Sequence, residues 1–167
     1  MIMDKYIPIV EIEEMIVLFK MPNNNTFPLW CYGAPTILRV NERIYATVPD
    51  VSPDIPPMCN TRLQLFYKEG DSPWHRIYIN PVYDQREPCP IAYLGDGKII
   101  VSINPAVSPF RGDEEGKWLM WYSEPYLLCF EEKPSQPHFP ELIKPEWDTA
   151  WLFTDHSYRG LATDPNR

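Results

Sequence analysis

Residues 33–48 read GAPTILRVNERIYATV, and residues 88–103 read PCPIAYLGDGKIIVSI. The two stretches align without a gap when Pro35 is set on Pro90, and each has a proline, an apolar run, a polar turn, a basic residue and a second apolar run. The turn is Asn41-Glu42 in the first and Asp96-Gly97 in the second. A two-residue polar turn between β-rich runs is typical of a hairpin, and Asp-Gly is its strongest form. The sequence therefore predicts two matching hairpins.

Each hairpin is followed by a long loop and then by further strands. The alternation of polar and apolar residues in RLQLFY, residues 62–67, is typical of a half-buried strand. The other predicted strands lie at residues 74–79, 126–131 and 141–144, with an extra one over 117–122 in the loop 104–124. The run Ile99 to Ile103 is apolar enough to be buried on both faces. Each unit is thus predicted to be four antiparallel strands.

Stacking of such units predicts an all-β fold, because one four-stranded sheet needs cover on its faces. We expect a single domain over residues 1–167, an incomplete β-propeller of about two and a half blades. Blade 1 would span 33–80, blade 2 would span 88–145, and blade 3 would begin at 157–167. A propeller needs about four blades to close, so either the chain is a fragment of a longer protein or the strands form a β-sandwich. The segment 7–20 is predicted to be one strand, with a short helix as the alternative.

Composition narrows the classes of function. The 20 prolines favour short strands and stiff loops, and 44% hydrophobic residues supply a core. A net charge of −8 argues against nucleic acid or an anionic membrane as a partner. No signal peptide or membrane span is predicted, which makes a cytoplasmic location the default. The four cysteines stand apart, so we expect reduced thiols, no metal and no cofactor. P-loop, Rossmann, HExxH and GxSxG motifs are missing.

Three stretches resemble the sialidase-like propellers, also called BNR or Asp-box repeat proteins. They are Tyr32-Gly-Ala-Pro-Thr-Ile-Leu38 with its hairpin, Cys89-Pro-Ile-Ala-Tyr-Leu-Gly-Asp-Gly-Lys98, and Glu69-Gly-Asp-Ser-Pro-Trp74, which is similar to a degraded Asp-box. The resemblance implies a propeller and a glycan-directed role, and a glycoside hydrolase if the chain is an enzyme. The arginine that grips a substrate carboxylate in that family falls on Gly33. The resemblance therefore supports the propeller fold more strongly than it supports a catalytic activity.

Strand direction predicts where functional residues gather. Antiparallel strands alternate in direction, so the short turns share one rim, and the long loops 49–60 and 104–124 lie on the opposite rim with the crossovers 80–88 and 148–157. Long loops on a rigid scaffold are where function usually collects. We therefore predict Asp50, Asp54 and Glu87 as catalytic acids, because glycoside hydrolysis needs carboxyl groups. The substrate-binding residues predicted on this rim are Arg86, His156, Tyr158 and Arg159.

Each of these residues also has a structural alternative. Asp50 and Asp54 adjoin prolines and would then only form turns. Arg86 and Glu87 would form a surface ion pair, and His156 would hydrogen-bond a neighbouring loop. The aromatic run 118–122 would be core rather than a sugar platform. The alternative function is accordingly a non-catalytic module that binds protein or glycan. The expected ligand is a carbohydrate, and the chain is also expected to self-associate through open blade edges.

Overall fold

A computed structural model describes residues 7, 9–10, 12–21, 23–24, 26, 33–55, 58–107, 122–133, 139–146, 153–154 and 159–164. None of these residues is helical, so the described part of the chain is all-β. Its strands are β1 (Ile37–Val40), β2 (Arg43–Val51), β3 (Thr61–Glu69), β4 (His75–Ile79), β5 (Ile91–Tyr93), β6 (Lys98–Ile103), β7 (Tyr122–Ser123), β8 (Tyr126–Glu131), β9 (Glu141–Ile143) and β10 (Phe153–Thr154).

Sheet 1 is the antiparallel sheet β1-β2-β3-β4. Its first hairpin has the predicted two-residue turn, since Val40 pairs with Arg43. Asn41 adopts a φ of 55°, the left-handed conformation that such turns require and that asparagine tolerates. The prediction of a tight hairpin at this place is confirmed.

Sheet 2 is the antiparallel sheet β5-β6-β8-β9. Its first hairpin departs from the prediction of a two-residue turn, because the Leu94 amide donates to the Lys98 carbonyl at 2.9 Å and leaves a three-residue loop. Gly95 and Gly97 both have positive φ there, at 86° and 84°. A second glycine outside the Asp-Gly pair thus lengthens the turn by one residue. The predicted burial of Ile99 to Ile103 is confirmed, since each of these residues is buried.

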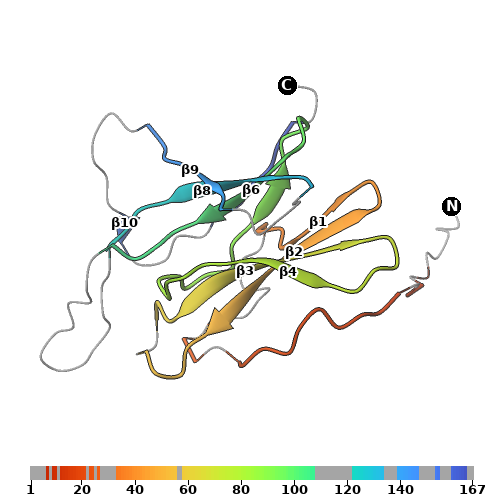
Figure 1. Cartoon of the computed structure of the whole chain (residues 1–167). Coiled ribbons are helices and arrows are strands. Elements are labelled where there is room, and N and C mark those ends of the chain that lie inside the picture. The colour runs from red at the N-terminus through yellow and green to blue at the C-terminus, as the bar shows by residue number, and fades with distance from the viewer. Residues whose placement is uncertain are drawn as a thin grey trace, which may run out of the picture.

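One hydrophobic core lies between the two sheets (Figure 1). Sheet 1 contributes Val40, Tyr45, Leu63 and Leu65, and sheet 2 contributes Cys89, which precedes β5, with Ile91, Ile99, Val101, Ile103, Leu128 and Phe130. The sheets also join at their first strands, where the Ile91 amide donates to the Pro35 carbonyl at 2.8 Å. Residues 33–48 and 88–103 therefore belong to two neighbouring sheets rather than to one. No closed sheet is seen among the described residues, and their packing fits both a propeller and a sandwich.

The outer faces of both sheets are partly covered by other segments of the chain. On sheet 1, the Lys68 Nζ donates to both carboxylate oxygens of Glu14 at 2.7 Å, and the Trp74 indole donates to Glu14 at 3.1 Å. On sheet 2, Leu161 packs against a small cluster that contains Ile100. The layers therefore follow one another as N-terminal segment, sheet 1, sheet 2 and the segment around Leu161.

Two predicted strands are wrong in the described residues. The N-terminal segment has neither strand nor helix at residues 7, 9–10 and 12–20. The start of blade 3 predicts an inner strand over residues 158–163, and residues 159–163 carry no strand either. The predicted extra strand at 117–122 lies outside the described residues except for Tyr122, which belongs to β7 and pairs with β10.

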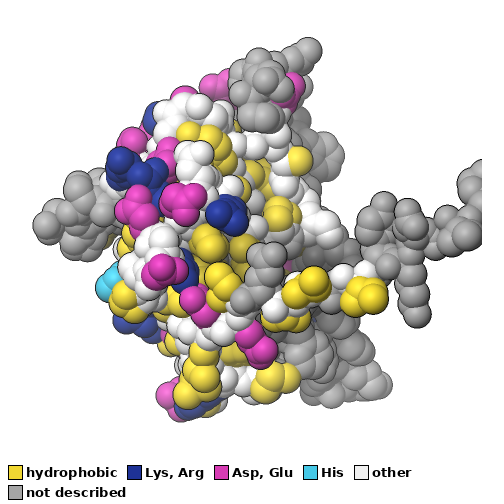
Figure 2. Space-filling model, turned by 90° about the vertical axis from the view of Figure 1, so that its right-hand side faces the viewer, with side chains coloured by type: hydrophobic (Ala, Val, Ile, Leu, Met, Phe, Trp, Pro, Cys, Tyr) yellow, Lys and Arg dark blue, Asp and Glu magenta, His cyan; other side chains and the backbone are white. Residues whose placement is uncertain are grey.

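Apolar side chains stay exposed on the N-terminal segment. Figure 2 shows hydrophobic side chains across one face, with acidic and basic side chains mixed together at its side. The exposed hydrophobic residues of the segment are Ile7, Ile9, Val10, Ile12, Met15, Leu18, Phe19 and Met21. Ile16 and Val17 are only partly exposed and line a hollow against β2. One side of the segment therefore faces sheet 1 and the other is uncovered by described residues.

Candidate functional site

The long loops and the first crossover meet on one rim, as the strand directions predict. The Thr61 amide donates to the Gln85 carbonyl at 3.0 Å, and the Asn104 amide donates to Gln85 Oε1 at 2.8 Å. Asn104 Nδ2 also donates to Ser123 Oγ at 2.8 Å. The opposite rim carries the short turns, where Arg43 binds both Glu69 and Glu132. The long-loop rim is thus a connected network of buried polar groups.

Arg86 and Glu87 form an ion pair in the interior of this rim. Arg86 Nη1 lies 2.9 Å from Glu87 Oε1, and the two side chains are 4% and 3% exposed. The ion pair that was expected at the surface is instead buried, because Asn24, Thr26 and the crossover cover it. Burial raises the pKa of Glu87, and the charges of Arg86 and Arg159 partly oppose that shift.

Arg159 is the second arginine that the fold brings to Glu87. Its Nη1 lies 3.5 Å from Ser102 Oγ and its Nη2 lies 3.5 Å from the Pro88 carbonyl. The structure thus gathers three predicted residues, Arg86, Glu87 and Arg159. His156 and Tyr158, also predicted for this site, lie outside the described residues.

Asp50 lies apart from that cluster. It belongs to β2, where it pairs with Arg62 across the strands, rather than to the predicted loop or a turn. Arg62 Nε binds Asp50 Oδ2 at 2.7 Å, the Tyr83 hydroxyl donates to the same oxygen at 2.9 Å, and the Arg62 guanidinium stacks over the Tyr83 ring. The predictions that Asp50 lies in a long loop or only forms a turn are therefore both wrong. Asp50 instead holds two neighbouring strands together through its contacts with Arg62 and Tyr83.

Asp54 has the structural role that the sequence left open as its alternative. It is exposed in a turn, and its amide donates to Ser52 Oγ at 3.3 Å. Asp50 is bound by Arg62, Asp54 lies in this exposed turn, and Glu87 is paired with Arg86 in the interior. The three predicted catalytic acids therefore do not form one constellation.

The hollow that Glu87 lines together with other described residues is too small for a substrate. The hollow lined by Glu87, Pro88, Gln85 and strands β2 and β3 has a volume of about 10 Å³. A space of that size holds roughly one water molecule. Neither Cys59 nor Cys89 offers an alternative nucleophile there, because burial raises the pKa of Cys59 to about 12 and that of Cys89 to about 11. The predicted cluster thus has the character of a packed structural network.

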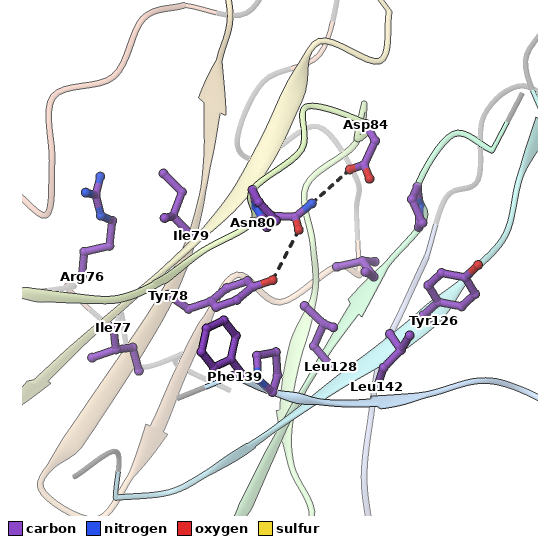
Figure 3. A pocket seen from close by; sticks show the side chains of 14 residues that line it. Arg76, Ile77, Tyr78, Ile79, Asn80, Asp84, Tyr126, Leu128, Phe139 and Leu142 are labelled. Atoms are coloured by element: carbon purple, nitrogen blue, oxygen red, sulfur yellow. Dashed lines mark hydrogen bonds between the residues drawn. The ribbon is translucent and has the colours of Figure 1, made fainter. Parts of the chain in front are cut away.

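A much larger pocket lies elsewhere, between the outer strands β4 and β9 (Figure 3). Its volume is about 610 Å³, within the range of small-molecule sites. We call it the outer-strand pocket; it is lined by residues 76–81, Asp84, Ile103, Pro105, Tyr126, Leu128, Phe139, Pro140 and Leu142. Its walls are mostly aromatic and aliphatic side chains that come from both sheets and from the segments next to β4 and β9.

One end of the outer-strand pocket is polar. The Tyr78 hydroxyl donates to Asn80 Oδ1 at 3.3 Å, and Asn80 Nδ2 donates to Asp84 Oδ1 at 3.1 Å (Figure 3). Gln85 Nε2 donates to the same Asp84 oxygen at 2.8 Å. Burial raises the pKa of Asp84, while these amide donors oppose the shift. The pocket therefore combines apolar walls with a carboxyl group at one end.

Sequence reasoning missed this pocket. Asn80 and Asp84 lie in the crossover 80–88 that was placed on the functional rim, but no local motif distinguishes them. The only available signal was the position of two polar side chains directly after an outer strand. The apolar walls come from four separate stretches of sequence that only the packing of the two sheets brings together.

Other kinds of site are not found in the described part of the chain. No group of three or more His, Cys, Asp or Glu side chains is placed there to hold a metal ion. No helix in the described residues is long and apolar enough to cross a membrane. In comparisons with family models, curated proteins and solved structures, none matches this chain, and the resemblance to sialidase-like propellers stays a prediction.

Proposed function

We propose that this chain is a non-catalytic binding module that takes a ring-bearing ligand in the outer-strand pocket. The observation that carries the proposal is a pocket of about 610 Å³ with Tyr78, Tyr126 and Phe139 on its walls and hydrogen-bonding groups at one end. Aromatic rings offer faces on which the apolar side of another ring can pack. Asn80 and Asp84 fix the orientation of a ligand by accepting or donating hydrogen bonds.

The state of the predicted acids supports binding rather than hydrolysis. Glycoside hydrolysis needs two carboxyl groups that face the same bond across an open site. Asp50 is held by Arg62, and Glu87 is held by Arg86 beside a hollow of about 10 Å³. Gly33, at the place of the family arginine, is not among the residues that line this hollow or the outer-strand pocket. A carbohydrate remains the ligand class that the sequence resemblance predicts, and a sugar ring also presents an apolar face.

The proposed architecture is a stack of successive propeller-like units, and the repeat supports it. Tyr45 and Ile100 are equivalent in the gapless alignment of the two hairpins. Tyr45 faces sheet 2, whereas Ile100 faces away from sheet 1, in the cluster on which Leu161 packs. In a sandwich of two sheets related by a twofold axis, equivalent residues would both face the shared core. A translational repeat instead points each equivalent residue toward the next unit.

A binding screen with a pocket-blocking variant tests the proposed function. Leu142 lines the pocket, whereas its neighbour Ile143 does not, so Leu142→Trp narrows the pocket and Ile143→Trp is the matched control on the same exposed strand. Saturation-transfer NMR with arylalkyl compounds, monosaccharides and sialosides measures binding. We expect a ring-bearing probe to bind the native chain and Ile143→Trp, to lose binding in Leu142→Trp, and to be recovered uncleaved. Equal binding to both variants, cleavage of a glycoside, or no binding by any probe would refute the proposal.

A further inference from the structure

Among the described acidic residues that are not exposed, Asp84 is the one without a lysine or arginine partner in the described part of the chain. Five carboxylates in the described part of the chain are not exposed, and the other four each have a lysine or arginine within 4.0 Å. These pairs are Asp50–Arg62, Glu87–Arg86, Glu132–Arg43 and Glu124–Lys144. Asp84 is half-buried, and the groups that donate to its carboxyl are the side-chain amides of Asn80 and Gln85 and its own backbone amide. A carboxylate taken out of water without a cation lowers stability, so such a group calls for an explanation.

The geometry leaves one side of this carboxylate available to the pocket. Both side-chain amides bind Oδ1, and neither uses Oδ2. Arg76 is the one basic residue that lines the outer-strand pocket, and its Nη1 donates to Gln64 Oε1 at 3.1 Å. Figure 3 shows Arg76 and Asp84 at opposite ends of the pocket. The chain itself therefore supplies no cation to Asp84 from the described residues.

We propose that the outer-strand pocket binds a ligand whose ring carries an ammonium group, with the nitrogen at Asp84 and the ring between Tyr78 and Leu128. This inference rests on the proposed function and adds the charge of the ligand to it. An ammonium ion would form a charge-assisted hydrogen bond with Asp84, and the nearby aromatic rings favour a cation as well. The net charge of −8 raises the local concentration of cations. An arylalkylamine and an amino sugar share this chemistry.

Isothermal titration of the full chain with three matched probes tests the ligand charge. The probes are phenethylamine, the neutral 2-phenylethanol and the anionic 3-phenylpropionate, which differ mainly in the group that meets Asp84. We expect phenethylamine to bind about tenfold more tightly than the alcohol, the scale of one hydrogen bond to a charged group, and the acid to bind most weakly. Glucosamine against glucose forms a second arm that separates an amino sugar from an arylalkylamine.

The variant Asp84→Asn removes the charge and keeps the Oδ1 acceptor for Asn80 and Gln85. It should bind the amine and the alcohol within about threefold of each other, while Asp54→Asn, an exposed control, should keep the native preference. A thermal melt of each variant checks its fold. Equal binding of amine and alcohol to the native chain would overturn the charge proposal and leave the pocket standing. If no probe binds, both the charge proposal and the proposed function are overturned. If the preference for the amine survives in Asp84→Asn, the role of Asp84 is overturned.

Discussion

Replacing Glu87 by alanine should destabilise the fold strongly, because it removes the carboxylate that pairs with a buried arginine. The Arg86 side chain is 4% exposed and its Nη1 lies 2.9 Å from Glu87. Removing one partner of a buried ion pair costs about 3–5 kcal/mol, since the remaining charge is left without compensation. Arg159 adds a second positive charge near the same place, so we expect the upper half of that range. For a domain of this size the loss corresponds to a fall in Tm of roughly 8–20 °C.

Urea and thermal unfolding followed by circular dichroism measure this loss. Glu87→Gln keeps an acceptor for Arg86 and should lose less, and the double variant Arg86→Met with Glu87→Met should recover much of the stability because neither charge of the pair is left buried. Asp54→Ala is the control, since Asp54 is exposed and a surface change stays within about 0.5 kcal/mol. If Glu87→Ala unfolds within about 1 kcal/mol of the native chain, Glu87 is not part of a structural ion pair, and its role as a site residue regains support.

Three further predictions follow from the same contacts. Burial raises the pKa of Asp84 above its value in the unfolded chain, so the stability that Asp84 contributes is present at low pH and is lost as the pH rises through its folded pKa. Asp84→Asn should therefore have a higher Tm than the native chain at pH 7, and the difference in Tm should close below about pH 4. A difference in Tm that stays constant across pH would contradict this prediction. Cys59 and Cys89, with pKa values raised to about 12 and about 11, should resist a thiol-specific reagent at pH 8 until urea unfolds the chain; fast labelling of the native protein would show that these thiols are accessible. Leu65→Ala, at a fully buried position in the shared core, should cost about 2–5 kcal/mol in urea unfolding, whereas a loss as small as that of the exposed Leu142→Ala would mean that the two sheets do not pack on each other.

The sequence is most informative where the structure is local. The Asn41-Glu42 turn needs a left-handed residue, and asparagine supplies it, so the first hairpin and its register follow from a few neighbouring residues. β8 also begins and ends at the bounds predicted for the third strand of the second unit, Tyr126 and Glu131. Local chemistry therefore determines the turns and strands that carry the fold.

Asp50 shows how a local rule misleads. The sequence predicts that a loop begins at Pro49, because proline cannot donate within a sheet. In the structure the Thr47 amide donates to the carbonyl of Thr36, which directly precedes β1, and Pro49 lies two residues further along β2, beyond the residues that pair with β1. Its missing amide therefore falls on an unpaired edge, and β2 continues through Asp50 to Val51.

The candidate site was harder to predict for a different reason. Arg86 and Glu87 are adjacent in sequence, and only the packing of the N-terminal segment on the crossover shows that they are buried. The walls of the outer-strand pocket come from both sheets, so no single stretch of sequence contains its pattern. What makes Asp84 notable is the lack of a basic neighbour among described residues, which is a property of the folded chain and not of the residues beside it.

Chemical-shift mapping with phenethylamine distinguishes the outer-strand pocket from the long-loop rim most directly. With assigned backbone and methyl signals, the proposed binding predicts that the largest shifts on titration occur at Tyr78, Asp84, Leu128 and Leu142, with Asp50 and Arg159 unchanged. Shifts centred on Arg86, Glu87 and Arg159, or no shifts at all, would contradict a binding site between the outer strands.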